Sequence, residues 1–171
     1  MIGRPTTLLL TAGTAALALS TIAARPATRY VWNASGSVPI GLYRLQPTGN
    51  LFVAQLVAVQ PPEPLATFLN ERGYLPRGVP MLKRVLALPG QTVCRNGLTI
   101  TVDNIANGEA HHRDSRGRPL PAWQGFRVIA AGEVFLMNWQ SADSLDGRYF
   151  GVLTTTAIIG RAQPLCIGED D

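Results

Sequence analysis

The sequence predicts one domain that is mainly β with minor α, preceded by one N-terminal membrane helix. Three observations support this class. A length of 171 residues fits one domain, or one domain with an inserted subdomain. Short apolar runs, each ended by Pro or Gly, follow one another from residue 37 onward. With 46% hydrophobic and 15% charged residues, the chain can bury a core and is not expected to be disordered.

The first part of the chain has the character of a membrane or export segment. Residues 6–24 carry no charge, and Arg4 and Arg25 flank them. This length is close to the roughly 20 residues that cross a bilayer as a helix. We assign residues 1–28 to a retained anchor or a cleaved signal segment, and a buried helix of a soluble protein is the alternative. In either export case, residues 29–171 form the domain on the periplasmic side of the inner membrane.

The remaining elements are expected mostly as strands. A turn and a strand span 37–45, and a helix over 65–72 is capped by Gly73. The polar segment 104–125, rich in Gly, Arg and His, is expected as an exposed insertion in this single domain. The other expected elements are strands over 51–59, 81–88, 133–137 and 157–162, and a hairpin over 93–102 around Asn96-Gly97.

Charge and cysteine content exclude several classes of partner. The fifteen Lys and Arg residues are scattered and the net charge is only +4, so we expect no nucleic acid. Cys94 and Cys166 lack both CxxC spacing and a nearby His, which argues against zinc. They can pair outside the cytoplasm or remain as two separate thiols. No metal and no cofactor are expected.

The first candidate site residues lie in the stretch Asn33-Ala34-Ser35-Gly36-Ser37-Val38-Pro39. Gly36 frees the backbone before Ser37, and Pro39 restricts it afterwards. Such a turn presents a hydroxyl and its own backbone N–H at one point, as acyl transfer requires. The Ser35 hydroxyl is a second candidate donor. An ordinary polar turn is the simpler interpretation of this stretch taken alone.

A candidate base lies in the run Met81-Leu82-Lys83-Arg84-Val85-Leu86-Ala87-Leu88. In a strand, Lys83 shares a face with Met81, Val85 and Ala87. Burial among apolar side chains lowers a lysine pKa, and a neutral amine can accept a proton from a serine. Arg84 faces the other way and stays charged. A lysine that extends to the surface is the alternative.

A third segment reads Ser144-Leu145-Asp146-Gly147-Arg148-Tyr149-Phe150-Gly151. Ser144 is a candidate to hydrogen-bond the amine of Lys83 and orient it. A carboxylate in contact with Lys83 would raise the lysine pKa, which opposes a role as base. We therefore expect Asp146 to pair mainly with Arg148 and to hold the loop.

These three segments, in this order after a membrane segment, resemble the type I signal peptidase family. That family carries Ser-Gly-Ser-Met-x-Pro, Lys-Arg-Val-x-x-x-Pro-Gly and Ser-x-Asp-Ser-Arg-Tyr-x-Gly, and the resemblance spans residues 30–163. In particular, the chain resembles the TraF-type peptidases of plasmid conjugation. The stretches that indicate this branch are Ser37-Val38-Pro39-Ile40-Gly41-Leu42-Tyr43-Arg44 and Glu71-Arg72-Gly73-Tyr74-Leu75-Pro76.

The resemblance implies a β fold of the signal peptidase and LexA kind and a Ser-Lys dyad. Ser37 would be the nucleophile and Lys83 the general base. The Ser37 N–H and the Ser35 hydroxyl would form the oxyanion hole, and Ser144 would orient the base. Asp146 matches an acidic residue treated as functional in the conjugative branch, and it is included as catalytic. The implied activity is maturation, with possible cyclisation, of a pilin precursor at the inner membrane.

Departures from the family pattern and rival functions are also visible. Gly147 stands where Ser is usual, which predicts a looser loop, and Asn138-Trp139-Gln140 replaces Gly-Asp-Asn. One rival is a general signal peptidase for exported preproteins, and another is a non-enzymatic exported subunit of a transfer channel. A repressor-type Ser/Lys autoprotease would carry a DNA-binding helix-turn-helix instead of a membrane segment. A Ser-His-Asp triad would need His111 or His112, which we expect to be exposed.

Overall fold

The computed structural model describes residues 3, 9, 12–14 and 29–168. The membrane helix expected within residues 1–28 therefore lies almost wholly outside the described residues. Within the described part of the chain, no helix is both long enough and apolar enough to span a bilayer.

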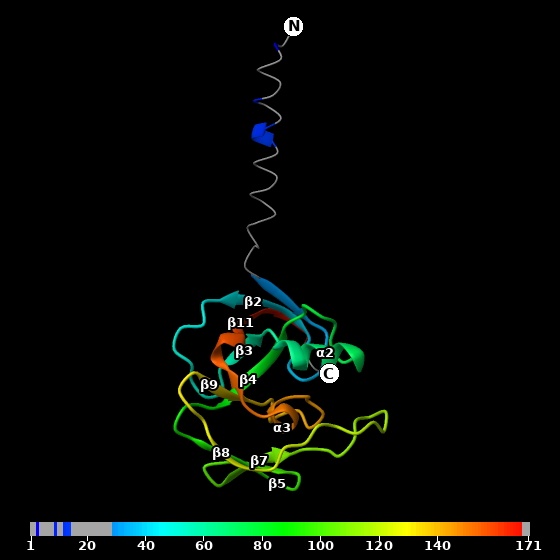
Figure 1. Cartoon of the computed structure of the whole chain (residues 1–171), viewed down its shortest axis with the longest axis vertical. Helices are drawn as coiled ribbons and strands as arrows, with labels where there is room; N and C mark the ends of the chain where they lie inside the picture. The colour runs from blue at the N-terminus through cyan, green and yellow to red at the C-terminus, as the bar shows by residue number, and fades with distance from the viewer. Residues whose placement is uncertain (1–2, 4–8, 10–11, 15–28, 169–171) are drawn as a thin grey trace.

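Two antiparallel sheets form the body of the domain (Figure 1), which confirms the mainly β class. One has seven strands in the order β1-β2-β11-β3-β4-β9-β10, and the other has four in the order β7-β6-β5-β8. The elements are β1 (Tyr30–Asn33), β2 (Gly41–Gln46), β3 (Leu56–Val59), α2 (Glu63–Glu71), β4 (Met81–Ala87), β5 (Thr92–Asn96), β6 (Thr99–Val102), β7 (Ile105–Glu109), β8 (Gly125–Val128), β9 (Glu133–Leu136), α3 (Gly147–Phe150), β10 (Leu153–Thr154), η1 (Thr155–Ala157) and β11 (Ile158–Ile167).

Most predicted elements are present, with three differences. The strand expected over 51–59 begins only at Leu56, because residues 52–55 form a turn in which Ala54 has a positive φ of 72°. The last strand, β11, runs to Ile167, beyond the expected end at 162. The expected insertion 104–125 contributes β7 to the four-stranded sheet, and the rest of it is mostly irregular and exposed.

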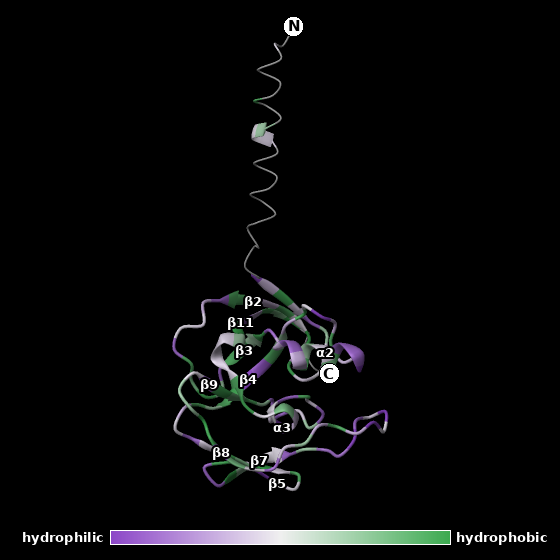
Figure 2. Ribbon diagram, in the orientation of Figure 1, coloured by the Kyte–Doolittle hydropathy of each residue, from purple (hydrophilic) through white to green (hydrophobic). Residues whose placement is uncertain are grey.

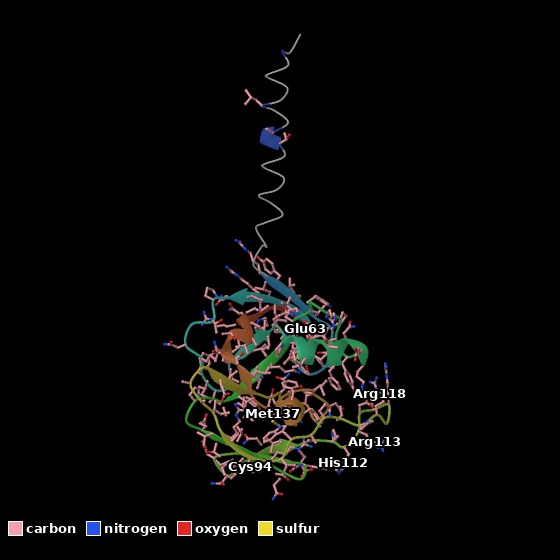
Figure 3. All side chains as sticks on the ribbon, in the orientation of Figure 1. Glu63, Cys94, His112, Arg113, Arg118 and Met137 are labelled. Carbon is pink, nitrogen blue, oxygen red and sulfur yellow. The ribbon has the colours of Figure 1, made fainter. Side chains whose placement is uncertain are left out.

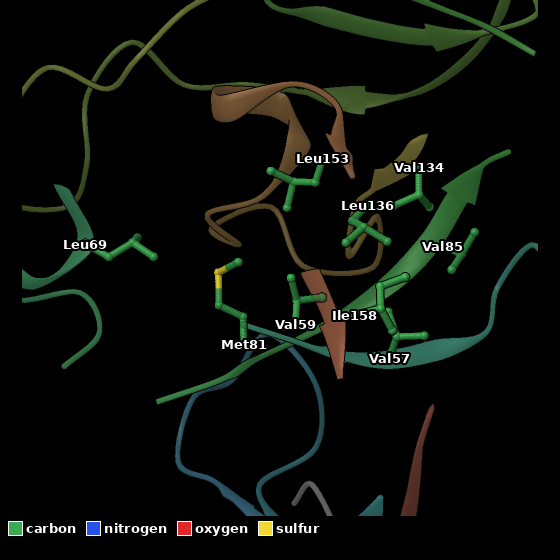
Figure 4. Close-up of a cluster of buried hydrophobic side chains, with 9 residues drawn as sticks. All are labelled: Val57, Val59, Leu69, Met81, Val85, Val134, Leu136, Leu153 and Ile158. Carbon is green, nitrogen blue, oxygen red and sulfur yellow. The ribbon is translucent and has the colours of Figure 1, made fainter. Parts of the chain in front are cut away.

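The principal core packs on one face of the larger sheet (Figure 4). Leu69 from α2 packs against this face, and Met81 and Val85 on β4 flank the position of Lys83. Figure 2 shows a hydrophilic section in β4 between apolar parts of the central strands, where Lys83 and Arg84 interrupt the apolar run. Burial of each large apolar side chain contributes about 1.5–3 kcal/mol, so β4 is held rigidly. The cluster consists of Val57, Val59, Leu69, Met81, Val85, Val134, Leu136, Leu153 and Ile158.

A second core joins the two sheets. Phe135 and Met137 from the end of β9 pack with Val93 and Ile100 of the smaller sheet. A register shift between Val85 and Ala87 turns Ala87 into this second cluster. The apolar row expected beside Lys83 therefore consists of Met81 and Val85, with Ala87 directed elsewhere.

The two cysteines lie in different sheets and are both free thiols. Cys94 is in β5 of the four-stranded sheet, and Cys166 is near the end of β11 in the seven-stranded sheet. The sequence left open either a disulfide or two separate thiols, and the structure has two separate thiols.

Candidate active site

The serine-containing turn links β1 to β2 and is held by the side chain of Asn33. The Asn33 amide nitrogen lies 2.7, 2.9 and 3.1 Å from the main-chain carbonyl oxygens of Ser35, Val38 and Pro39. The Tyr43 hydroxyl also donates to the Pro39 carbonyl, at 2.7 Å. Asn33 and Tyr43 are both buried. The turn is therefore fixed by buried hydrogen bonds that satisfy its carbonyl groups.

The two serines of the turn touch each other. Ser35 Oγ donates to Asn33 Oδ1 at 2.9 Å and lies 3.2 Å from Ser37 Oγ. Since a hydroxyl has one proton, Ser35 then accepts from the hydroxyl of Ser37. Asn33 was not among the residues singled out from the sequence. Its position at the end of a strand, directly before a serine-rich turn, is typical of side chains that cap turns.

Gly41 fixes how the turn joins the sheet. Its φ is +153°, and a Cβ atom there would lie 2.1 Å from the carbonyl oxygen of Cys166. Only glycine permits this close approach of β2 to β11. The turn therefore enters the sheet at a defined position.

Lys83 is buried on β4, with only 5% of the residue exposed. Its Nζ atom donates to Ser144 Oγ at 2.9 Å, which confirms the expected contact. Burial lowers the pKa of Lys83 from 10.5 to about 8, although the nearby carboxylate of Asp146 acts in the opposite direction and Arg148 assists the lowering. Desolvation disfavours the ammonium form, so a neutral amine becomes accessible near neutral pH.

The backbone on both sides of Lys83 is clamped by Asn138. The buried Asn138 side chain accepts from the Arg84 N–H at 2.9 Å and donates to the Leu82 carbonyl at 3.1 Å. Its own N–H donates to Asp146 Oδ2 at 3.0 Å. Asn138 stands in the Asn-Trp-Gln triplet that departs from the family pattern, and the sequence did not indicate this clamping function.

Asp146 and Arg148 form a buried ion pair, as expected from the sequence. Arg148 Nε lies 2.9 Å from Asp146 Oδ1, and their side chains are 2% and 0% exposed. The guanidinium also donates to the main-chain carbonyls of Ser141, Ala142 and Ser144 at 2.6, 3.1 and 3.1 Å. The pair therefore shapes the loop that carries Ser144, and hydrogen bonds satisfy both charges.

Gly147 does not loosen this loop, contrary to the expectation from the sequence. A Cβ atom at Gly147 would lie 2.7 Å from the Leu136 carbonyl oxygen and 2.8 Å from the Phe135 ring. The residue is buried at the start of α3, where Asp146 caps the helix by accepting from the Arg148 N–H. Close packing thus explains why glycine stands where serine is usual.

One cavity of about 640 Å³ brings the candidate residues together. Ser35, Ser37, Lys83 and Ser144 line it, whereas Asp146 does not. Within residues 29–168, no hydrogen bond joins Ser37 to Lys83. The Ser37 hydroxyl is hydrogen-bonded to Ser35 instead, and the Lys83 amine to Ser144. The cavity can hold an acyl group between a hydroxyl and a buried amine.

Other chemistries find less support at this cavity. His111 and His112 are exposed, and neither lines the cavity; His111 Nε2 lies 3.8 Å from Asp143 Oδ1 at the surface. In the described ranges, no cluster of three or more His, Cys, Asp or Glu residues is suited to a metal ion.

Comparisons with known proteins agree on one family. A family model described as signal peptidase, peptidase S26, matches residues 4–166. The chain belongs to this family. It is 34% identical to a probable conjugal transfer protein TraF of Sinorhizobium fredii, over 94% of this chain and 89% of that protein. It is 31% identical to a plasmid transfer protein TraF of Escherichia coli, over 78% and 80% of the two chains.

Two further similarities are to proteins named signal peptidase I. A probable signal peptidase I-1 of Synechocystis is 33% identical over 64% of this chain and 52% of that protein. A solved signal peptidase I of Enterococcus faecalis covers 67% of this chain and 97% of its own, at 17% identity and a TM-score of 0.40. Membership of the S26 family follows from the sequence matches.

Stability should depend on pH through Lys83. Its pKa is about 8 in the folded chain and near 10.5 when unfolded, so the unfolded state binds more protons between these values. The free energy of unfolding should therefore rise with pH in that window, by about 2–3 kcal/mol between pH 7 and 10, relative to a Lys83→Met variant. Urea unfolding of both proteins at the two pH values measures this. An equal pH dependence in both would contradict it.

Removal of the Asp146 carboxylate should destabilise the fold. Asp146→Ala leaves the buried guanidinium of Arg148 without a counterion, which typically costs about 3–5 kcal/mol. The matched control is Asp143→Ala, because the Asp143 side chain is 97% exposed and its loss should cost less than about 0.5 kcal/mol. Denaturant unfolding compares the two variants, and equal stabilities would show that the buried pair does not hold the loop.

Proposed function

We propose that the chain is a serine endopeptidase of the signal peptidase type with a Ser37–Lys83 dyad. It would mature the pilin precursor of a conjugative transfer system. The observation that carries the proposal is the buried amine of Lys83, with a pKa of about 8, in the same cavity as the Ser37 hydroxyl. A buried lysine with a lowered pKa beside a serine has the protonation state that a general base needs.

The acylation step begins with a rotation of the Ser37 side chain. Its hydroxyl leaves Ser35 and turns to the neutral amine of Lys83. Ser37 Oγ then bonds to the substrate carbonyl carbon while its proton passes to Lys83 Nζ. The Ser37 N–H donates to the oxyanion, and the Ser35 hydroxyl donates to it as well after turning away from Asn33 Oδ1. Collapse breaks the C–N bond, and Lys83 returns the proton to the leaving amine.

The acyl-enzyme is resolved by a second nucleophile. Lys83 takes a proton from water as the water oxygen adds to the acyl carbon. The bond from this carbon to Ser37 Oγ then breaks, Lys83 returns the proton to Ser37 Oγ, and a linear product is released. The substrate's own amino group can attack instead, which forms a peptide bond and a cyclic product. A tethered amine competes with water because effective molarities reach the order of 10⁵ M or more.

Ser144, Asp146 and Arg148 act as positioning residues in this proposal. Ser144 accepts one N–H of the Lys83 amine and directs the amine lone pair toward the cavity. The Asp146–Arg148 pair holds the loop that carries Ser144. Asp146 is fully buried and does not line the cavity, so its proposed contribution is indirect.

The cavity suits an extended peptide with small or apolar side chains. β1 is an edge strand, and Val31 and Asn33 of this strand line the cavity. An edge strand can pair with an added peptide through main-chain hydrogen bonds. Leu69, Met81 and Leu82 supply apolar surface to the same cavity.

The conjugative role and the location are inferred from relatives. Relatives named conjugal or plasmid transfer protein TraF match most of this chain, whereas the signal peptidase of Synechocystis matches about two thirds of it. We therefore favour pilin maturation over general preprotein cleavage and over a non-enzymatic channel subunit. The catalytic domain would act on the periplasmic side of the inner membrane, on a small membrane-inserted precursor.

Processing of a candidate pilin precursor should require both dyad residues. In co-expression with the precursor, Ser37→Ala and Lys83→Met should each reduce processing by on the order of 10⁴-fold, since each removes an essential partner of one proton transfer. Intact mass of the precursor measures this, and a product lighter by one water than the trimmed linear peptide reports a ring. Thr156→Ala, at an exposed hydroxyl of η1 that does not line the cavity, is the control. Normal processing by either dyad variant would contradict the proposal.

The pH dependence of the purified enzyme should follow Lys83. Only the neutral amine accepts the Ser37 proton, so kcat/KM should rise about tenfold from pH 7 to pH 9 and level off above a pKa of about 8. Peptide cleavage at fixed ionic strength measures the profile. A rate that is flat over this range, or that falls, would exclude Lys83 as the base.

A further inference from the structure

The irregular part of the expected insertion folds back onto the cavity wall. Residues 110–120 follow β7 and pass beside the end of α2, where Figure 3 labels Arg113 and Arg118. A short hairpin forms here, with Asp114 N–H donating to the Arg118 carbonyl at 2.9 Å. We call residues 110–120 the rim hairpin.

Asp114 is the centre of the rim hairpin, and its side chain is only 9% exposed. Its Oδ1 accepts from the backbone N–H groups of Arg116 and Arg118 at 3.0 and 2.8 Å. Its Oδ2 accepts from Arg118 Nε at 2.7 Å and from the Tyr74 hydroxyl at 2.5 Å. These four donors, first among them the Tyr74 hydroxyl, hold the pKa of Asp114 well below its ordinary value. One carboxylate therefore ties the hairpin to Tyr74.

Arg118 reinforces the same tie. Its guanidinium lies 4.8 Å from the centre of the Tyr74 ring and donates to the Arg72 carbonyl at 2.8 Å. A guanidinium over an aromatic face is attracted by the ring electrons. Tyr74 also packs against Phe68 of α2, with ring centres 5.9 Å apart. The ring is therefore held on several sides.

Tyr74 lines the same cavity as Ser37 and Lys83, in an apolar wall with Leu69, Leu75 and Val79. None of the proposed proton transfers uses this wall. At a second position, His111 Nε2 of the rim hairpin lies 3.8 Å from Oδ1 of Asp143, an exposed residue at the edge of the cavity lining. The rim hairpin thus fixes this apolar wall in place. A fixed wall can select which peptide side chains enter the cavity.

We infer that Tyr74, held by Asp114 and Arg118 of the rim hairpin, is a specificity-determining residue that packs against an apolar side chain of the substrate peptide. This inference rests on the proposed function for its substrate class. A ring fixed before binding loses no rotamer freedom when the substrate enters, which favours affinity. Contacts remote from the reacting atoms bind substrate and transition state alike, so KM should change and kcat should not.

The test uses the purified full-length chain with peptides that span the cleavage junction, each carrying Leu or Ala at one position in turn. Tyr74→Phe keeps the ring and removes its hydroxyl. Asp114→Asn keeps an oxygen for the two hairpin N–H groups and removes the charge. Each should raise KM about tenfold for the preferred Leu peptide, leave kcat within about twofold and reduce the preference for Leu over Ala. The double variant should resemble Asp114→Asn alone, because both changes break the Tyr74–Asp114 hydrogen bond and only Asp114→Asn also breaks the ion pair with Arg118.

Controls separate recognition from stability and from catalysis. Glu133→Gln breaks the exposed pair between Arg127 and Glu133, away from the cavity, and should leave KM unchanged. Binding of the Leu peptide to a Ser37→Ala background, with and without Tyr74→Phe, measures recognition without turnover and should weaken by the same factor. If Tyr74→Phe and Asp114→Asn lower the melting temperature but leave KM, peptide affinity and preference unchanged, the inference is wrong. A different result would separate the two proposals. If the wild-type protein binds the Leu peptide more tightly than the Ala peptide, Tyr74→Phe reduces this preference, and neither peptide is ever cleaved, the proposed function fails and the inference stands.

Discussion

A lysine amine can act as a base near neutral pH only if its ammonium form is destabilised, and at Lys83 burial does this. Met81 and Val85 flank it in the principal core, and only 5% of the residue is exposed. The cost of desolvation is larger than the opposing effect of the Asp146 carboxylate, so the pKa falls to about 8. The site therefore depends on a rigid β4 that keeps the amine buried among apolar side chains where Lys83 lines the cavity.

Buried polar side chains supply this rigidity where the strands end. Asn138 binds the backbone on both sides of Lys83, and Asn33 binds three carbonyls of the Ser37 turn. Arg148 does the same for the loop that carries Ser144, with its charge balanced by Asp146. Each buried amide or guanidinium satisfies several backbone groups that irregular segments would otherwise leave without partners. Loop geometry at the cavity is thus as well determined as strand geometry.

Some departures of the sequence from its family become intelligible in the fold. Gly147 is required by the contact of α3 with Leu136 and Phe135, and Asn138 takes part in clamping β4. Strand lengths were predicted less well than strand positions. Residues 51–55 have the composition of a strand, but residues 52–55 form a turn in which Ala54 has a positive φ. Ala54 and Gln55 still hydrogen-bond the backbone of Val85, and regular strand pairing begins at Leu56 with β4 and at Val57 with β11.

The sequence by itself determined the mainly β class, the three segments that carry the candidate site, and the alternation that places Lys83 and Arg84 on opposite faces of a strand. These properties are local, since they follow from the period of a strand and from motifs read in order. Only the tertiary structure decided that Asn33 and Asn138 hold the site, that the two cysteines stay apart, and that the rim hairpin reaches Tyr74. Each of these depends on contacts between residues far apart in the chain, such as the 2.5 Å bond between Tyr74 and Asp114. Composition and spacing do not specify such distances, because contacts between distant residues form only when the sheets and loops pack together.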